Sequence, residues 1–497
     1  MTDAPAARPG IAERLSRLIR VNTVSAHLVE HGTAEFEAVL EELYPLVHQH
    51  LVKERIGERG LLFRWEAAAG GFETPAPPAP QPPSGAAGGF ETPAPPAPQP
   101  TGAGRTSIPE ERPEAASRRA ATPAILMAHY DTVPLAEDDS WTHPPLSGAI
   151  EHGTVWGRGA IDDKGALVVL LDAVENLLAA GGTPKRPVFL SLGGDEETSG
   201  VSARAISEEL AARGIRPWIV LDEGGAVVDG ILPGLPQSAA VVGLGEKGVL
   251  SVRLTATAPA GHASTPGRAR TAPERIARAV TRLHRNPFPK RLSRTSRQMF
   301  EAYRGHARGA GRVLIEAVPR LAPVSARLLS LLGGEPAAMV QTTVATTVLE
   351  GGGAHNVIPN SASAVLNLRI ALGETVSSTL AVLRRAIGDP AISIEVIEGH
   401  DPSAESRTDT AQWRLIERAV GAAYPGTLTV PYVMMQASDA RHFQPLAPEA
   451  TYRFAPLAMS SEERTGLHGV NERVTVDALE RGERFYRELI GALPAYD

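Results

Sequence analysis

The sequence predicts an α/β fold in which a doubly wound, mostly parallel sheet is interrupted by a smaller α+β domain. Segments with the patterns of strands and helices alternate over residues 124–221, as they do when helices connect parallel strands. Longer strands with alternating polarity begin near residue 243, and the first pattern returns after about residue 401. We therefore expect an open sheet with helices on both faces and a second, separate layer inserted into it.

Two domains are also expected from the length, because a chain of 497 residues is too long for one ordinary core. The larger domain is predicted to comprise residues 1–245 and 401–497, and the smaller one residues 246–400. Residues 68–120 are rich in proline, alanine and glycine, and the sequence GGFETPAPPAPQP occurs there twice. Such a segment cannot bury a core, so we predict that it is a disordered insertion.

The elements of the larger domain follow from the spacing of apolar residues, which recur every three or four positions in helices and form short runs in buried strands. The predicted helices are 11–21, 36–51, 163–180, 201–213 and, near the C-terminus, 476–493. The predicted strands are 60–65, 124–128, 186–192 and 217–221. Ligands bind outside the carboxyl ends of the strands in open sheets of this kind, so the residues that follow these strands are the first place to look for a site.

The smaller domain is predicted to contain more strands than helices. The strands are 249–256, 340–349, 363–370 and 392–397, and the helix is 375–387. A long, arginine-rich and mostly helical stretch covers residues 291–332. Basic residues also cluster at 289–294, which we interpret as a solvated helix face.

Composition excludes several classes of function. Hydrophobic residues make up 43% of the chain and charged residues 21%, as in a soluble globular protein. The net charge of −7 gives no reason to expect nucleic acid or a membrane as partner. The absence of cysteine excludes disulfides, thiolate metal sites and cysteine nucleophiles. The N-terminus lacks the pattern of a signal peptide and no apolar run is long enough to span a membrane, so a cytoplasmic protein is expected.

A histidine and an aspartate stand two residues apart at the end of a predicted strand, at His129 and Asp131. Side chains two positions apart in a strand lie on the same side of the sheet. An imidazole and a carboxylate placed together in this way can share one metal site. A structural hydrogen bond between them explains the motif equally well when it is considered alone.

Four further segments place acids or a histidine at strand ends and in loops. Asp162 and Asp163 precede a predicted helix, where capping is their simplest role. The three acids at 195–197 follow a fully apolar strand, where a cation would relieve both their repulsion and their desolvation. The acids at 222–223 follow the next strand, and His468 lies in a loop near the C-terminus.

Together these segments predict a pair of metal ions, although each is a weak signal by itself. Two histidines and three carboxylates, one of them bridging, satisfy two ions roughly 3.5–4 Å apart. Zn²⁺ is the expected metal because all the donors are nitrogen or oxygen, and Co²⁺ or Mn²⁺ are compatible with the same donors.

The chain resembles the aminoacylase/carboxypeptidase family of di-zinc metallopeptidases, which includes aminoacylase, succinyl-diaminopimelate desuccinylase and carboxypeptidase S. The matching motifs, in chain order, are MAHYDTVP, WGRGAIDDKG, GGDEETSG, LDEGG, GHASTP, NVIPNSA, SDARHF and GLHGVNERV. The nearest branch is that of carboxypeptidase S and the N-acyl-amino-acid hydrolases. The resemblance implies a zinc-peptidase-like catalytic domain and a ferredoxin-like inserted domain that acts as a lid and in dimerisation.

The resemblance assigns the ligands of the first metal. It implies that His129 binds this ion, that Asp131 hydrogen-bonds His129 and fixes its tautomer, and that Asp162 bridges both ions. Asp222 is implied to complete the first site, with Glu223 as a competitor because the family uses either acid.

The resemblance also assigns the second metal and the catalytic groups. Glu197 and His468 are implied to bind the second ion, and Glu196 is implied to be the general base that takes a proton from water. His262 resembles the histidine of the small domain that stabilises the oxyanion, often from a neighbouring subunit. Read without the family, His262 is an ordinary loop histidine.

Asn356 and Arg441 resemble substrate-positioning residues, since an arginine fork suits a substrate carboxylate. For Arg441 a surface ion pair with Asp439 is an equally good interpretation. The implied activity is cleavage of the amide bond of N-acyl-amino acids or small peptides that carry a free α-carboxylate. Closure of the smaller domain would bring His262 and Asn356 to the metals.

Four alternatives remain at this stage. Within the enzyme class the chain is also consistent with a dipeptidase, with a biosynthetic deacetylase or desuccinylase, or with a carbamoyl-amide hydrolase. The fourth belongs to another class, a non-catalytic metal-binding scaffold whose proline-rich repeat recruits partners. Retention of both Glu196 and Asp131 argues against the scaffold, because metal binding alone requires neither residue. The expected partner is a small-molecule substrate, with a homodimer formed through the inserted domain as a further expectation.

Overall fold

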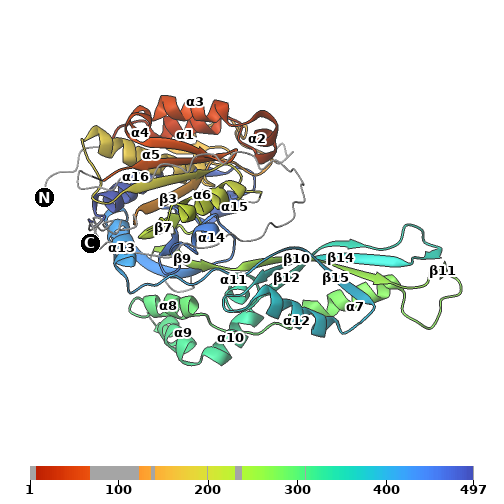
Figure 1. Cartoon of the computed structure of the whole chain (residues 1–497). Coiled ribbons are helices and arrows are strands. Elements are labelled where there is room, and N and C mark those ends of the chain that lie inside the picture. Colours follow the sequence, from red (N-terminus) through yellow and green to blue (C-terminus); the bar gives the residue numbers. More distant parts are fainter. Residues whose placement is uncertain are drawn as a thin grey trace, which may run out of the picture.

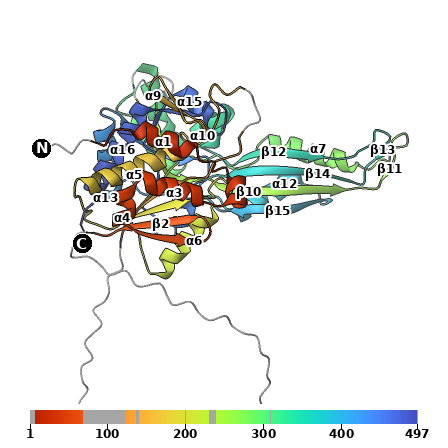
Figure 2. The ribbon, with the colours of Figure 1, turned by 90° about the horizontal axis from the view of Figure 1, so that it is seen from above.

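The computed structural model describes residues 7–67, 122–135, 140–198, 200–229, 238–307 and 309–495. The proline-rich segment predicted to be disordered, residues 68–120, lies outside the described residues. Two sheets dominate the described part of the chain, and they extend away from each other in both views of the ribbon (Figures 1 and 2).

The larger sheet is mixed, with parallel pairs at its centre. Its order is β1 (Val52–Ile56), β2 (Gly60–Trp65), β6 (Val188–Gly193), β3 (Ala124–His129), β7 (Ile219–Asp222), β17 (Thr451–Arg453), β9 (Ala239–Glu246), β8 (Val227–Val228) and β18 (Ala458–Met459), with β16 (Leu428–Met434) paired to β9. Strands β6, β3, β7 and β17 run parallel, whereas the β1–β2 hairpin joins antiparallel. The α/β fold predicted from the alternating pattern is confirmed.

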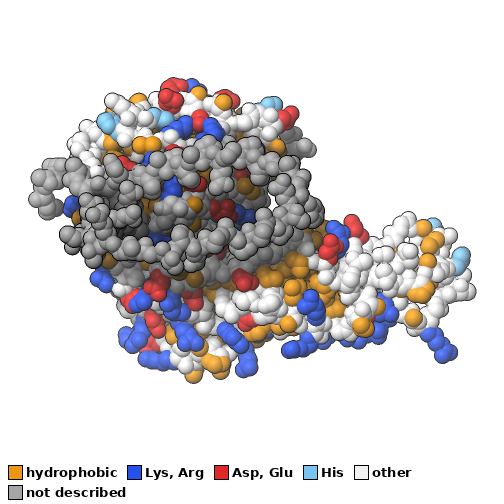
Figure 3. Space-filling model, viewed as in Figure 1, with side chains coloured by type: hydrophobic (Ala, Val, Ile, Leu, Met, Phe, Trp, Pro, Cys, Tyr) orange, Lys and Arg blue, Asp and Glu red, His pale blue; other side chains and the backbone are white. Residues whose placement is uncertain are grey.

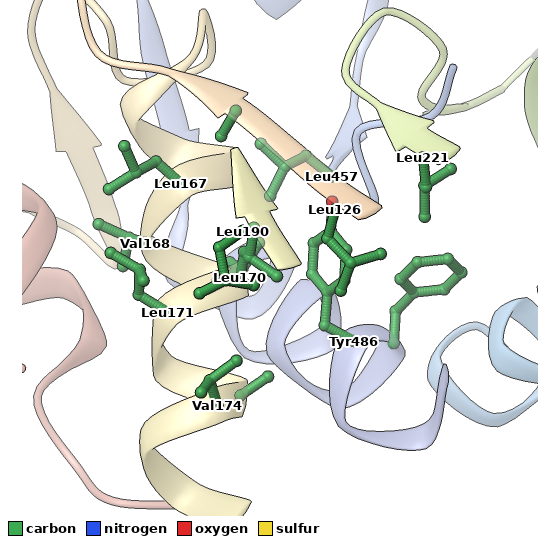
Figure 4. Close-up of a cluster of buried hydrophobic side chains, with 14 of the residues drawn as sticks. Leu126, Leu167, Val168, Leu170, Leu171, Val174, Leu190, Leu221, Leu457 and Tyr486 are labelled. Atoms are coloured by element: carbon green, nitrogen blue, oxygen red, sulfur yellow. The ribbon is translucent and has the colours of Figure 1, made fainter. Parts of the chain in front are cut away.

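Helices cover both faces of this sheet. On one face lie α1 (Ile11–Ile19), α5 (Lys164–Ala179), α13 (Ala411–Ala423) and α16 (Val476–Gly491), and on the other lie α6 (Val201–Ala212) and α14 (Ala440–Phe443). The period of two in β3 explains the division, because Leu126 packs with α5 whereas Ile125 and Met127 pack with α6. Figure 4 shows Leu126 and Leu190 beside the apolar side chains of α5.

The predicted helix 36–51 is divided into two in the structure. Helix α3 (Ala34–Leu43) ends before Tyr44, and α4 (Pro45–His50) begins with a proline. The residue before a proline avoids the helical conformation, and Tyr44 has φ −129° and ψ 61°. Both helices still pack on the α5 side of the sheet, and α2 (Ser25–His31) precedes them.

The smaller sheet is antiparallel and has a core of its own. Its order is β12 (Thr343–Glu350), β14 (Ser361–Ile370), β10 (Gly248–Thr257) and β15 (Ile392–His400). Helices α7 (Ala272–His284) and α12 (Val376–Ile387) cover one face. We call these six elements the four-stranded unit. At its far end, β11 (Gly261–His262) pairs with β13 (Val357–Ile358) (Figure 1).

The arginine-rich stretch forms three helices that pack on the larger sheet, and a fourth helix follows it. The three are α8 (Arg294–Tyr303), α9 (Gly309–Arg320) and α10 (Ala322–Leu331), and the fourth is α11 (Gly334–Ala338). Met299, Phe300 and Ile315 share a core with Val241 of β9 and Val430 of β16. These helices lie within the residues predicted to form the smaller domain, but their core is that of the larger sheet. A helical period shows which face is buried and does not show what buries it.

A three-stranded sheet connects the C-terminal region to the loop before α5. It consists of β19 (Arg473–Thr475), β5 (Thr154–Trp156) and β4 (Ala149–Glu151), and the short helix α15 (Ser461–Gly466) precedes it. Among the described residues, no helix combines the length and the apolar character needed to cross a membrane.

Candidate metal centre

His129 ends strand β3 and is buried, with 2% of its surface exposed. Its Nδ1 lies 3.1 Å from the backbone oxygen of Asp131 and 3.4 Å from Asp131 Oδ1. The other ring nitrogen, Nε2, lies 3.0 Å from Asp162 Oδ1. The sequence left open a structural contact with Asp131 or a metal site, and the two nitrogens allow both at once.

Asp162 lies between two histidines. Its Oδ1 faces His129 Nε2 and its Oδ2 faces His468 Nε2, each at 3.0 Å. Burial favours the protonated carboxyl, yet the hydrogen bonds from His129 and His468 hold the pKa of Asp162 below its usual range. In turn, the hydrogen bond to Asp162 is the main reason that the pKa of His468 rises to about 10. A carboxylate that offers one oxygen to each imidazole has the geometry of a bridging ligand.

Glu197 stands beside the same two histidines, in the loop after β6. Its Oε1 lies 3.4 Å from His468 Nε2 and is buried without a hydrogen bond from the described residues. One potential ligand atom from each of His129, Asp162 and Glu197 lies within 4.8 Å of the others. Three donors converge on one small volume, so a cation there would also give the orphaned oxygen a partner.

The neighbouring Glu196 is held in surroundings that favour its protonated form. Burial raises the pKa of Glu196 well above its usual value, the charge of His129 opposes this, and repulsion from Asp439, Asp162 and Glu197 adds to it. A carboxyl in these surroundings exchanges protons closer to neutral pH than a solvated one, as a general acid or base must.

Asp222 and Glu223 follow β7, and their carboxyl groups have different partners. Asp222 Oδ2 accepts a hydrogen bond of 2.6 Å from the backbone N–H of Ala440. Burial raises the pKa of Glu223 well above its usual value, and Asp162 is the strongest of the charges that add to this effect. The Asp222 carboxylate is thus engaged by the backbone, whereas Glu223 is repelled by the acid that lies between the two histidines.

Asp131 is fully buried and holds more than the histidine. Its Oδ1 accepts the backbone N–H of Glu196 at 3.0 Å, and its Oδ2 accepts the backbone N–H of Glu197 at 3.2 Å. The Ser25 hydroxyl donates to Oδ2 at 2.9 Å. One carboxylate therefore fastens the end of β3, the start of α2 and the loop after β6 together.

These side chains offer ligand atoms that suit a divalent cation. We call them the strand-end cluster, and its members are His129, Asp162, Glu196, Glu197, Asp222, Glu223 and His468. All of its donors are oxygen or imidazole nitrogen, and its carboxylates outnumber its histidines. A positive ion would offset the burial and the repulsion that together raise the pKa values of Glu196 and Glu223.

Two charged residues that were not predicted from the sequence fix the backbone next to this cluster. Glu472 is fully buried, and its carboxylate accepts the backbone N–H of Ile161 at 2.8 Å and of Asp162 at 3.0 Å. Arg158 pairs with it at 2.7 Å. Glu472 thereby joins the loop that contains His468 to the loop that contains Asp162. Arg158 lies in the motif WGRGAIDDKG and Glu472 in the motif GLHGVNERV. A charged residue in a loop motif does not reveal from the sequence that it is buried.

His262 and Asn356 lie together, but away from the strand-end cluster. His262 belongs to β11, where its Nδ1 lies 2.7 Å from Ser264 Oγ, and the backbone oxygen of Asn356 accepts the N–H of Ala263 at 3.0 Å. We call His262 and Asn356 the tip residues, because β11 and β13 lie at the end of the four-stranded unit farthest from the larger sheet (Figures 1 and 2). Within one chain the structure does not bring them to the cluster.

Arg441 lies in α14, beside the cluster. Its guanidinium donates to the backbone oxygen of Ser438 at 2.9 Å. Asp439, two residues before it, is buried, and both burial and repulsion from Asp222 raise the pKa of Asp439 well above its usual value although Arg441 opposes this. Arg441 is thus a cation next to an acid-rich site, which leaves both interpretations from the sequence open.

Solved structures share the overall fold. A metallo-carboxypeptidase of the M20 family from Sulfolobus solfataricus matches with a TM-score of 0.65 and 16% identity, and the match covers 97% of this chain and 99% of that one. The dipeptidase Dug1p from Saccharomyces cerevisiae matches with a TM-score of 0.61 and 14% identity over 98% of this chain and 96% of its own. At these low identities the likeness shows a shared fold and nothing more.

Relatives in sequence are considerably closer. The N-fatty-acyl-amino acid synthase/hydrolase PM20D1 of Xenopus tropicalis is 35% identical over 371 residues, which are 74% of this chain and 72% of the relative. The probable carboxypeptidase S-like 2 of Dictyostelium discoideum is 33% identical over 74% of this chain and 71% of its own length. The model of peptidase family M20/M25/M40 matches residues 125–492, which include every member of the strand-end cluster. The chain is therefore a member of peptidase family M20/M25/M40.

Proposed function

We propose that the strand-end cluster holds two Zn²⁺ ions that share the Asp162 carboxylate. The observation that carries this proposal is the placing of Asp162 between His129 Nε2 and His468 Nε2, at 3.0 Å from each. Glu197 joins His468 at the second ion, and its orphaned Oε1 supports that assignment. Co²⁺ or Mn²⁺ would suit the same donors.

The first ion requires one acid from positions 222 and 223. The sequence favours Asp222, but the hydrogen bond from Ala440 N–H to Asp222 Oδ2 supports Glu223 as the ligand and Asp222 as its support. A comparison of Asp222→Asn with Glu223→Gln separates the two assignments. The variant that removes the ligand should lose one metal equivalent per chain, as measured by elemental analysis, and the other should keep both.

The proposed reaction is hydrolysis of the amide bond of an N-acyl-amino acid or small peptide with a free α-carboxylate. When bound, the two ions would supply a water of lowered pKa and an electrophile for the substrate carbonyl. Glu196 takes the proton of that water and delivers it to the leaving nitrogen. Asp131 keeps the His129 ring and the Glu196 backbone in fixed positions.

The substrate class rests on the relatives and on one cation. The names of the relatives refer to fatty-acyl-amino acids and to carboxypeptidases, and both kinds of substrate carry a free carboxylate next to the scissile amide. Arg441, beside the cluster, is the proposed partner of that carboxylate. The tip residues would bind the oxyanion and the substrate after closure of the four-stranded unit or from a second copy in a homodimer.

A substrate panel tests the proposal directly. Acyl-amino acids with acyl groups from acetyl to long-chain, together with dipeptides, are incubated with the zinc-loaded chain, and the free amino acid is measured by liquid chromatography. We expect hydrolysis that stops on thorough chelation and that falls by about 10²–10⁴ in Glu196→Gln while metal content is unchanged. Activity that survives chelation, or a fully active Glu196→Gln variant, would falsify the mechanism.

A further inference from the structure

Helix α10 turns its larger apolar side chains towards solvent. These residues are spaced three or four positions apart, so they share one face of the helix, and between 52% and 81% of each is exposed. They are Leu321, Val324, Leu328, Leu331 and Leu332. The face of α10 that packs on the protein carries Ser325 and Ala326, both buried, and the partly buried Ala322 and Leu329. We call the exposed stripe the α10 apolar face.

This arrangement reverses the rule that other helices of the chain follow. In α7, Ile276, Ala279 and Leu283 are buried, and the residues between them on the outer face are charged or polar. A surface helix that exposes most of its leucines and fully buries only a serine and an alanine has no advantage in a chain that stays alone in water. Contiguous apolar surface of this kind marks a place where another surface docks.

The segment that contains the α10 apolar face is rich in arginine. Residues 291–332 contain eight arginines, two glutamates and no lysine, a local net charge of +6 in a chain whose net charge is −7. The side chains of Arg312 and Arg320 in α9 are 66% and 64% exposed, and both pair with Glu316, so one acid stands between two cations. Val313, also in α9, is 71% exposed. Figure 3 shows apolar and basic side chains mixed along the lower edge of the molecule, over α9 and α10.

We propose that α9 and α10 form a docking surface for an anionic lipid bilayer. Leucines that enter the acyl boundary, together with arginines at the level of the headgroups, are the combination by which amphipathic helices bind such a surface. A second copy of the chain fits less well, because an interface made from this face would bring its arginines against one another. The net charge of the whole chain does not reveal this surface, because a basic segment and an acidic remainder are summed in it.

The docking surface is connected to the loop of His468 through α11 and α15. Helix α11 follows α10, and Glu335 in α11 pairs with Arg464 at 4.0 Å. Arg464 belongs to α15, which leads directly to the loop of His468. If the proposed function holds, a bilayer at α10 would present an acylated substrate to the side of the enzyme on which His468 lies. The binding itself does not depend on that function.

The experiment is flotation of the full chain with vesicles of equal parts phosphatidylglycerol and phosphatidylcholine, compared with vesicles of phosphatidylcholine alone. We expect binding to the anionic vesicles, which weakens in high salt. Two double variants, Leu328→Ser with Leu331→Ser and Arg312→Gln with Arg320→Gln, should each weaken it at least about tenfold. The control replaces two other exposed valines, Val29→Ser with Val201→Ser, and should bind as the unaltered chain does.

Each other outcome contradicts the proposal. Absence of binding, or equal binding by both double variants, would show that this face does not meet lipid. A dimer seen by light scattering that the leucine variant abolishes would assign the face to a second copy. Hydrolysis of a soluble acetyl-amino acid should be the same in all variants. If that activity is absent throughout while flotation behaves as expected, the proposed function fails and the docking surface stands.

Discussion

The strand-end cluster and the tip residues are both parts of the proposed site, but the fold treats them differently. Neighbouring parallel strands end at one edge, so β3, β6 and β7 deliver their donors to one place without any further arrangement. The tip residues lie at the end of an antiparallel unit that extends away from that edge. One chain therefore suffices to assemble the proposed metal donors, whereas the complete proposed site would require closure of the four-stranded unit or a second chain.

Replacing Asp162, the proposed bridging acid, is expected to have the largest effect. Asp162→Asn removes the charge that both histidines face, so the chain should lose metal, and activity should fall by about a thousandfold or more because the metals supply several kcal/mol of transition-state stabilisation. Metal content by elemental analysis and kcat/KM are the measurements. Asp409→Asn, at an exposed acid, is the control. Two ions retained in Asp162→Asn would show that Asp162 is not shared between them.

A substitution at the tip residues should have a smaller effect, on kcat and not on metal content. His262→Ala is expected to lower kcat by about 10²–10³, the loss expected for one oxyanion donor, with metal content unchanged. His152→Ala, at a 93% exposed loop histidine, should have no effect.

Mixed dimers sharpen this comparison. Co-expression of the His262→Ala chain with a Glu196→Gln chain should restore activity if the tip serves the site of its partner, because one site per mixed dimer is then intact. A fully active His262→Ala variant would mean that the tip does not reach the chemistry at all.

A weaker effect is expected from a substitution of Glu472, which supports the backbone next to the cluster. Glu472→Gln leaves the side chain in place but removes the charge that pairs with Arg158 and that accepts the N–H of Asp162. Metal affinity measured by competition with a chelating dye should fall by about 10–100-fold. Glu462→Gln, with an 80% exposed side chain, is the matched control. Unchanged affinity would make Glu472 a purely structural residue.

The smallest effect is a pH dependence of the metal-free chain. Burial raises the pKa values of Asp163, Glu196 and Glu223 above their unfolded values of about 4. These carboxyls stabilise the fold fully below the unfolded pKa, and the stability is lost as pH rises through the folded pKa. In chelator, Tm should therefore fall by the order of a few degrees between about pH 5 and pH 7, and Zn²⁺ should remove the decline. A Tm that rises over this range would contradict the assignment.

Much of the fold was predictable because its signals are local. The alternation of strands and helices and the acids after apolar strands can be read from short segments, and the predicted helix 163–180 is found as α5 (Lys164–Ala179). The break at Tyr44 was also visible, as the proline that follows it. Partners far apart in sequence were not visible: the pairing of Arg158 with Glu472, and the packing of α8 and α9 on the larger sheet, depend on the tertiary fold alone.

The buried carboxylate of Asp131 has a consequence for how this enzyme can change. Asp131 contacts the His129 ring and accepts the N–H groups of Glu196 and Glu197, so the positions of the proposed ligand and the proposed base are coupled. A substitution that shifts the loop after β6 will disturb the geometry of His129 as well. Efforts to alter the chemistry by redesigning that loop should therefore keep its two N–H groups in register with Asp131, and look for variation in substrate choice elsewhere in the chain.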